Sequence, residues 1–394
     1  MAGEVITVYA GQQPPAFWDA CIFIGEPTPG PSASGSPWQS EVIALLRERW
    51  AGDGRLVVLL AEPSSGARDD DDGELIDWYG HAVDVADVAM FWWPEGADPR
   101  LMSTNLAAWN DSQRVVHGTP SHLRQSRYLL KYASRHAMST ATTLAGMVTA
   151  ALDKIGSGAR RAAGEREVPL PVWKTDSFQR WYAAQTSAGN TLLGARLVWT
   201  FSAGQNKRFL LYWALHVRVY VRGEDRVKTN EVVISRPDIS ALALYQRGAT
   251  IDDTAIVLVR EFRSPASTPD GLVHELPGGS GTAEADALDQ AVREAEEETG
   301  LAIDARRIRA HGSRQLAATV SAHHAHLFAA EITGAELARL RATQSAPHGA
   351  ADGTEQTWTE ITTFGQIREN RLVDWATLGM IAEVVLDRTT TPPA

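Results

Sequence analysis

The chain has 394 residues, of which 44% are hydrophobic and 22% are charged, a composition typical of globular proteins. This length favours two or three domains, each large enough to bury its own core. The formal net charge of −11 argues against non-specific nucleic-acid binding, because no basic excess is present to neutralise phosphates. No apolar run approaches the roughly 20 residues that span a bilayer, so we expect no membrane association.

Cysteine use and the N-terminal residues bear on the cellular compartment. Cys21 is the sole cysteine, so no intramolecular disulfide can form, which fits a reducing compartment. The first residues, MAGEVITVYAGQQPP, lack the basic segment and apolar core of a signal peptide. We therefore expect a cytoplasmic protein.

The first 150 residues or so alternate between strand-like and helix-like stretches. Apolar runs predict four buried strands, ACIFIGE (20–26), RLVVLLAEP (55–63), VAMFWWP (88–94) and QRVVHG (113–118). Helical apolar spacing predicts three helices, over 38–50, 75–86 and 122–137. Buried strands interleaved with helices predict an α/β fold with a flavodoxin/Rossmann-like parallel sheet and ligands at its carboxyl edge.

A change in composition follows this region. Residues 155–171, IGSGARRAAGEREVPLP, are rich in Gly, Ala and charged residues and end in prolines, which favours a linker. A short helix is predicted over 176–187, and the pattern becomes strand-rich from about residue 193. We therefore predict a domain over 1–154, a linker with a short helix over 155–192, and a second domain over 193–394.

The stretch REAEEETG (293–300) is the strongest chemical signal in the sequence. Glu294, Glu297 and Glu298 are spaced i, i+3 and i+4, so a helix places them on one face. Carboxylates packed in this way repel one another, and a hard divalent cation such as Mg²⁺ would offset that cost. Gly300 is a typical helix stop, and the upstream turn ELPGGSG (275–281) lets backbone approach a ligand closely.

Together these residues, GGSGTAEADALDQAVREAEEETGL (278–301), resemble the Nudix box, a loop–helix–loop signature. The positions in register with it are Gly279, Arg293, Glu294, Ala295, Glu297, Glu298, Gly300 and Leu301. One position departs from the pattern, because Ala285 stands where the family has a Glu, and Glu284 lies one place early. In the family that Glu is chiefly a partner of the Arg, so its loss puts helix rigidity in doubt more than metal binding. The resemblance implies a C-terminal Nudix α/β/α sandwich.

Segments that flank the motif indicate which branch of the Nudix family the sequence resembles. SRPDISALALY (235–245), VREFRSP (259–265) and HELPGG (274–279) are similar to the ADP-ribose pyrophosphatase branch of the family. The resemblance implies Mg²⁺, or Mn²⁺, as cofactor. It implies the metal-binding groups Glu294, Glu297, Glu298 and the carbonyl of Gly278. It also implies the substrate-binding residues Arg263, Glu275 and Gly279, although a surface ion pair is the alternative for Arg263.

The same resemblance identifies a catalytic set of Glu297, Arg293 and a general base on a later acidic loop. In APHGAADGTEQTWTEI (346–361), Glu355 is the first choice for that base and Asp352 the second. His323, His324 and His326 suggest a metal site less well, because neighbours on a strand face opposite sides. We expect an ordinary strand there.

The N-terminal region resembles the nucleoside 2-deoxyribosyltransferase-like family. Six positions match its layout: Gly25, Trp38, Trp78, Ala86, Asp87 and Pro94. The family's Glu nucleophile is expected in DPRLMSTNLAAWN (98–110), where Leu106 and Ala107 stand instead. Trp92 and Trp93 fit a base-stacking role less well than a core role. We therefore expect this domain to bind a nucleotide without transferase activity.

The leading functional hypothesis is Mg²⁺-dependent hydrolysis of the pyrophosphate in a nucleoside diphosphate-sugar, with ADP-ribose as the favoured substrate. The expected partner is thus a small nucleotide, and the resemblance also implies a homodimer. Two alternatives remain open at this point. One is a bifunctional enzyme whose first domain is an active N-glycosidase. The other is a non-catalytic nucleotide sensor, which the presence of Ala285 in place of the family's Glu favours.

Overall fold

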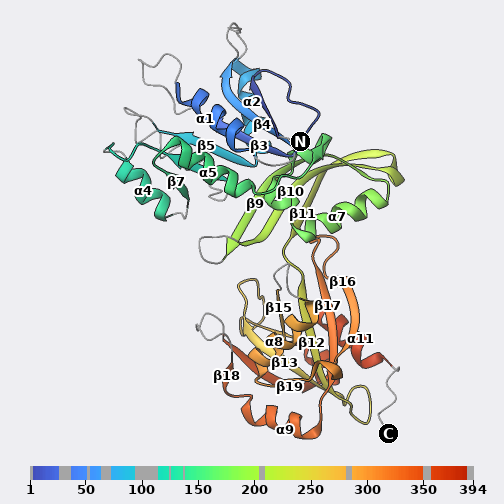
Figure 1. Cartoon of the computed structure of the whole chain (residues 1–394). Coiled ribbons are helices and arrows are strands. Elements are labelled where there is room, and N and C mark those ends of the chain that lie inside the picture. The colour runs from blue at the N-terminus through green and yellow to red at the C-terminus, as the bar shows by residue number, and fades with distance from the viewer. Residues whose placement is uncertain are drawn as a thin grey trace. The chain divides into compact units, whose positions relative to one another are not determined.

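The computed structural model describes residues 3–25, 37–50, 54–63, 72–93, 114–123, 126–135, 138–203, 209–280, 286–348 and 356–387. Its contacts divide the chain into two compact units, Met1–Ser235 and Arg236–Ala394 (Figure 1). We describe each unit by itself. In the ranges given above, no helix is both long enough and apolar enough to cross a membrane.

The first unit is built on a six-stranded sheet in which every neighbouring pair of strands is parallel. The strands in spatial order are β1 (Glu4–Ala10), β4 (Arg55–Pro63), β3 (Ala20–Gly25), β5 (Val88–Trp92), β6 (Val115–Gly118) and β7 (Ser139–Ala141). From β4 to β7 this is the flavodoxin-like order 2-1-3-4-5, with β1 added beside β4. The predicted parallel sheet is therefore confirmed.

Helices cover both faces of this sheet. One face carries α1 (Pro37–Arg49) and α5 (Leu144–Ile155), whose apolar residues, such as Leu46 and Met147, pack with Ile22 and Val58. The other face carries α2 (Asp72–Val85) and α4 (Ser126–Arg135) over a second core. Because both faces are covered, the strands are apolar throughout rather than alternating, which is why they were recognisable in the sequence.

The segment predicted as a linker is ordered. It contains the end of α5, β8 (Arg161–Ala162), the 3₁₀ helix η1 (Ala163–Glu167), α6 (Leu170–Trp173) and α7 (Asp176–Ser187). Strand β8 pairs with β2 (Phe17–Trp18) near the start of the chain. The segment therefore returns to the first unit and forms part of it.

A buried ion pair fixes this segment to the sheet. Arg161 and Asp87 are 0% and 1% exposed, and Arg161 Nη1 lies 2.8 Å from Asp87 Oδ1. Asp87 also accepts hydrogen bonds from the backbone N–H of Cys21 (2.8 Å) and of Leu170 (2.7 Å). Arg161 in turn donates to the carbonyl of Val168 at 2.6 Å. A fully hydrogen-bonded pair of this kind is the condition under which a charge is tolerated in a protein interior.

The first unit ends with a three-stranded antiparallel sheet in the order β11-β10-β9. These strands are β9 (Thr191–Ala203), β10 (Phe209–Val221) and β11 (Arg226–Ser235), with η3 (Arg222–Glu224) between the last two. Leu192, Leu215 and Val217 on the sheet form a core with Val168 and Phe178. This packing places the strands in the first unit, whereas we predicted a second domain beginning at residue 193.

The second unit has an eight-stranded mixed sheet. Its main path is β16 (Arg309–Gln315), β17 (His324–Glu331), β12 (Ile239–Gln246), β13 (Ala255–Phe262), β19 (Thr357–Thr363) and β18 (Pro347–His348). Two short strands lie off this path, β14 (Leu272–Glu275) beside β13 and β15 (Gly278–Ser280) beside β12. Among the described strands of this second sheet, only β12 and β17 pair in parallel.

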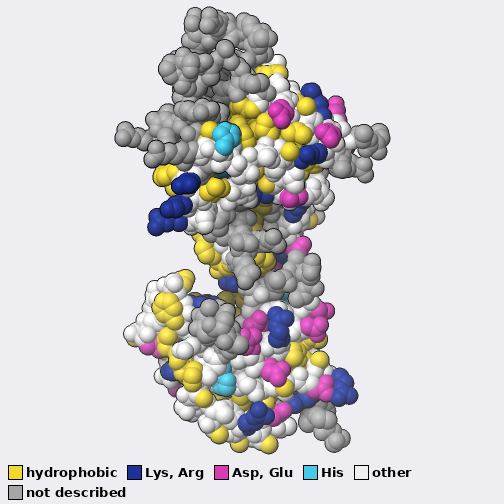
Figure 2. Space-filling view, turned by 60° about the vertical axis from the view of Figure 1, so that its left-hand side comes forward, with side chains coloured by type: hydrophobic (Ala, Val, Ile, Leu, Met, Phe, Trp, Pro, Cys, Tyr) yellow, Lys and Arg dark blue, Asp and Glu magenta, His cyan; other side chains and the backbone are white. Residues whose placement is uncertain are grey.

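Helices again pack on both faces, which gives the predicted α/β/α sandwich. On one face lie α8 (Ala287–Thr299) and α9 (Gly334–Thr343), with η4 (Ala305–Arg307) between them in sequence. On the other lie α10 (Phe364–Asn370) and α11 (Trp375–Leu386). Charged side chains of both signs lie side by side on the surface shown in Figure 2. In the second unit, Arg307 Nη1 lies 2.6 Å from Glu336 Oε1.

Candidate active site

Helix α8 carries the acidic motif, and its ends are set by local sequence. Asp286 caps the start of the helix, because its carboxylate accepts from the N–H of Leu288 at 2.8 Å. Gly300 ends the helix in the left-handed conformation, with φ of 69°. Ala291 and Ala295 bury the apolar side of the helix against the sheet. The predicted helix and its glycine stop are thus found where the motif indicated.

Two glycines of β15 lie directly against the glutamates of α8. The N–H of Gly278 donates to Glu298 Oε2 at 2.9 Å. A Cβ at Gly279 would lie only 2.7 Å from the Cδ atom of Glu294, and a Cβ at Gly278 would lie 2.2 Å from the carbonyl oxygen of Ser240. Position 278 therefore requires glycine, whereas a side chain at position 279 would displace the carboxylate of Glu294.

Glu298 is the most perturbed carboxyl group of the site. It is 6% exposed, and burial raises its pKa to about 9. The hydrogen bond from Gly278 opposes this shift, whereas the charges of Glu261, Glu294 and Glu275 add to it. Four carboxyl groups thus share one region, and a cation placed among them would be strongly attracted.

Arg263 lies beside this group of carboxylates. Its Nη2 atom is 2.5 Å from Glu261 Oε1 and 3.6 Å from Glu275 Oε1. Glu261 itself is 3% exposed on β13 and was not among the predicted site residues. Its signal in the sequence was a single acid inside the apolar strand AIVLVREF (255–262).

Arg293 and Glu294 are joined by a residue that the motif does not include. Gln290 is 2% exposed, accepts a hydrogen bond from Arg293 Nη2, and donates through Nε2 to Glu294 Oε1. Its Nε2 also lies 3.4 Å from the carbonyl oxygen of Ser280. Gln290 therefore gives Arg293 an acceptor in a chain whose sequence lacks the usual Glu at position 285.

The remaining predicted residues are placed as follows. Glu297 is exposed on α8 and forms no hydrogen bond or ion pair with any residue that the structure describes. Glu355 and Asp352, the two candidates for the general base, lie outside the described residues, as does Ala285. His326 contacts Asp238, with Nε2 3.2 Å from Oδ2, on an ordinary strand of the sheet.

The donor types at this site suit Mg²⁺. Within the described ranges, no three His, Cys, Asp or Glu side chains already form a metal-sized cluster. Mg²⁺ does not require one, since it commonly keeps several waters and takes one or two carboxylates together with substrate phosphates. The raised pKa of Glu298 and its crowding by three acids show a local excess of negative charge that such an ion would offset.

In the first unit, the candidate residues that lie in the described ranges have structural roles. Trp92 and Trp93 are 8% and 1% exposed, and Trp93 Nε1 donates to His117 Nδ1 at 3.2 Å, so both belong to the core. Asp87 is the partner of Arg161. The stretch 98–110, where the transferase nucleophile was sought, lies outside the described residues.

Comparison with known families agrees with the geometry of the second unit. The family model of the NUDIX domain matches residues 236–371, which include the glycine turn, α8 and the sheet around them. This range begins where the second compact unit begins. The second unit therefore carries a NUDIX domain, and this supports pyrophosphohydrolase chemistry for it. No curated protein matched the chain.

Proposed function

We propose that the second unit hydrolyses the pyrophosphate bond of a nucleoside diphosphate-sugar in the cytoplasm, with ADP-ribose as favoured substrate and Mg²⁺ or Mn²⁺ as cofactor. The observation that carries the proposal is the buried Glu298, held by Gly278 and crowded by Glu261, Glu275 and Glu294. The substrate class is supported by the flanking segments that resemble the ADP-ribose branch.

Each part of the site has a role in this reaction. Glu294, Glu298, the exposed Glu297 and the Gly278 carbonyl would hold the metal, which when bound neutralises the diphosphate and lowers the pKa of a water. Gly278 and Gly279 carry no side chains, so the turn can lie against the Ser240 carbonyl and the Glu294 carboxylate. Arg263, positioned by Glu261 and Glu275, presents a guanidinium that suits a phosphate oxygen pair. Glu355 is the proposed base that orients the attacking water.

The first test is the intact chain with ADP-ribose and Mg²⁺, with the products separated by chromatography. We expect AMP and ribose 5-phosphate from the unmodified protein and a loss of about 10²- to 10³-fold in turnover for Glu298→Gln, the range seen when one electrostatic contact to a transition state is removed. The matched control is Glu296→Gln, an exposed glutamate on the same helix at a position that the motif leaves unspecified, which should retain full turnover.

The outcomes separate the candidate functions. Tight binding of ADP-ribose without AMP formation would favour a nucleotide sensor. Turnover of another nucleoside diphosphate compound in place of ADP-ribose would correct the substrate and keep the reaction. Equal turnover by Glu298→Gln and Glu296→Gln would show that α8 is not the catalytic helix.

For the first unit we propose nucleotide binding without transferase activity. Support comes from its flavodoxin-like strand order and from Leu106 and Ala107 at the expected nucleophile position. The test uses full-length Glu298→Gln, in which the first unit is intact, with a panel of nucleosides and nucleotides. Release of free base would instead establish an N-glycosidase and hence the bifunctional alternative.

A further inference from the structure

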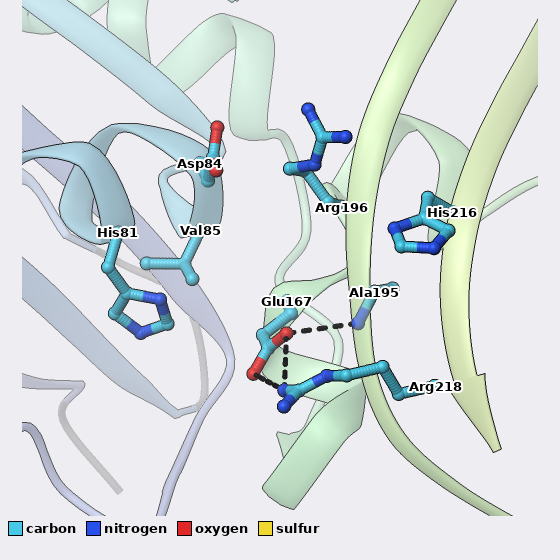
Figure 3. A pocket seen from close by; sticks show the side chains of 8 residues that line it. All are labelled: His81, Asp84, Val85, Glu167, Ala195, Arg196, His216 and Arg218. Atoms are coloured by element: carbon cyan, nitrogen blue, oxygen red, sulfur yellow. Dashed lines mark hydrogen bonds and ion pairs between the residues drawn. The ribbon is translucent and has the colours of Figure 1, made fainter. Parts of the chain in front are cut away.

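A cavity of about 230 Å³, lined largely by charged and histidine side chains, lies within the first unit, where α2 faces β9 and β10 (Figure 3). Its lining comes from α2, η1 and two strands: His81, Asp84, Val85, Glu167, Ala195, Arg196, His216 and Arg218. The end of α2 leads into the amino end of β5. The cavity is therefore at the opposite edge of the parallel sheet from the carboxyl ends, where ligands of this fold usually bind.

The floor of the cavity is held in place by close backbone packing. A Cβ at Gly164 would lie 2.4 Å from the carbonyl carbon of Leu193, so η1 rests directly on β9. A Cβ at Gly194 would lie 2.2 Å from Arg218 Nη2, so the Arg218 guanidinium lies across that glycine. The backbone contact at Gly164 requires glycine, and the Arg218 guanidinium occupies the space that a side chain at position 194 would take.

Glu167 completes this arrangement. Its Oε2 atom accepts from the N–H of Ala195 at 3.0 Å, and its two oxygens lie 3.2 and 3.4 Å from Arg218 Nη2. Both carboxylate oxygens of Glu167 are therefore occupied by contacts with Ala195 and Arg218. Arg218 uses only Nη2 in these contacts, and its Nε and Nη1 hydrogens meet no acceptor among the residues that the structure describes.

The walls of the cavity carry further hydrogen-bonding groups. Figure 3 shows His81 and Asp84 on α2 across the cavity from Arg196 and His216 on the strands. Within the described ranges, the side chains of Arg196 and Asp84 have no hydrogen bond or ion pair. His216 Nε2 contacts the carbonyl oxygen of Thr229 at 2.7 Å, so Nε2 carries the hydrogen and Nδ1 is left to meet a ligand.

This combination points to a ligand with both an anionic and a hydroxyl-bearing part. The guanidinium groups of Arg196 and Arg218 suit phosphate oxygens. The carboxylate of Asp84 suits sugar hydroxyls, which donate hydrogen bonds to it. The cavity is smaller than the roughly 300–1,000 Å³ of pockets that enclose larger ligands, so it suits one sugar phosphate rather than a dinucleotide.

We propose that this cavity of the first unit binds a sugar phosphate, with the phosphate on Arg196 and Arg218 and the hydroxyls on Asp84. The site is separate from the glutamate cluster of the second unit. The proposal therefore does not depend on the proposed hydrolase activity.

The test is calorimetric titration of the full-length chain with ribose 5-phosphate in EDTA, so that no divalent cation supports binding at the glutamate cluster. We expect saturable binding that weakens at least tenfold in Arg196→Gln and is unchanged in Arg127→Gln, an exposed arginine of α4 in the same unit. Glu298→Gln should also bind normally. Asp84→Asn should weaken binding of ribose 5-phosphate and leave binding of inorganic phosphate unchanged.

Three results would overturn the proposal. The first is absence of binding by the unmodified chain at millimolar ribose 5-phosphate. The second is equal affinity in Arg196→Gln and Arg127→Gln, with both variants showing unaltered thermal unfolding. The third is equal affinity for ribose 5-phosphate and inorganic phosphate, since the hydroxyl contacts would then contribute nothing.

Discussion

Asp87 in the first unit and Glu298 in the second are both buried carboxyl groups, but the charges of the neighbouring side chains have opposite signs. Asp87 meets the guanidinium of Arg161 and two backbone N–H groups, so its charge is matched inside the protein. Glu298 meets one backbone N–H and three acids, and burial raises its pKa to about 9. The first arrangement is complete without a ligand, whereas in the second the crowding is relieved by protonation of Glu298, and a bound cation would offset it.

Breaking the matched pair should give the largest effect. Arg161→Met leaves the carboxylate of Asp87 buried without its partner, which should cost about 3–5 kcal/mol of stability in the first unit. Thermal unfolding of the full chain with hydrogen exchange of β3 and β5 measures this loss. The double variant Asp87→Asn, Arg161→Met should recover part of it. Equal stability of Arg161→Met and the exposed control Arg127→Met would show that the pair contributes nothing.

Replacing the carboxyl group of Glu298 should have the opposite effect on stability. Because its folded pKa of about 9 exceeds the value near 4.5 expected when unfolded, the folded chain keeps a proton that the unfolded chain releases. Metal-free stability should therefore fall by up to about 1.4 kcal/mol per pH unit as the pH rises from about 4.5 to 9. Glu298→Gln should remove this dependence.

The same variant should lose its response to Mg²⁺. For the unmodified chain, an ion at 100 times its Kd adds about 2.7 kcal/mol of stability. Melting of the second unit with and without Mg²⁺ at pH 8 measures both effects, with Glu296→Gln as the control. A Mg²⁺-induced shift that survives in Glu298→Gln would place the ion elsewhere.

Gln290 allows a finer test of the same cluster. Gln290→Leu removes the hydrogen bonds that join Arg293 to Glu294 and should lower turnover by about 10- to 100-fold, as is common for residues that orient metal ligands. We expect the dependence of rate on Mg²⁺ concentration to move to higher values, which a purely structural defect would not produce. The neighbouring Asp289→Asn, exposed on the same helix, serves as control. An unchanged Mg²⁺ dependence would assign Gln290 to packing alone.

His117 offers the most local test, because it is a buried titratable group that burial alone keeps neutral. Burial lowers its pKa to about 3. The unfolded chain binds a proton near pH 6.5 and the folded chain does not, so stability should fall by about 1.4 kcal/mol per pH unit as the pH drops from 6.5 towards 3. His117→Gln should flatten this loss in the hydrogen exchange of β5 and β6, whereas the exposed His122→Gln should leave the pH profile unchanged.

Local patterns in the sequence were sufficient to predict β3, β4, β5 and β6 of the first sheet and the motif helix, but not β1 or β7. Uniformly apolar runs marked strands β3, β4 and β5, and the Gly–Gly turn with the spaced glutamates predicted α8 with its glycine stop. The helix predicted over 176–187 is confirmed as α7, but the Gly/Ala-rich composition of 155–171 favoured a linker although this stretch holds Arg161, whose partner lies 74 residues away. Partners at such a distance leave no trace in local composition, and for the same reason Glu261 and the cavity around Arg196 were not predicted.

The domain boundary and Gln290 illustrate two further limits. Alternating strands after residue 193 suit either domain, and only the packing of Phe178 and Val168 against β9 and β10 assigns them to the first unit. Experiments on an isolated second unit should accordingly begin near Arg236. Gln290 falls at a position that the motif leaves unspecified, so its importance depends on a side-chain orientation that spacing does not determine.

The ion pair between Asp87 and Arg161 also sets an order of events during synthesis on the ribosome. Asp87 is made 74 residues before Arg161. At translation rates of about 5–20 residues per second, the strands β3 and β5 exist for roughly 4–15 seconds before their counter-charge is synthesised. A nascent chain in that interval carries the carboxylate of Asp87 with no guanidinium of Arg161 to neutralise it. The first unit therefore cannot complete its fold until Arg161 has been synthesised.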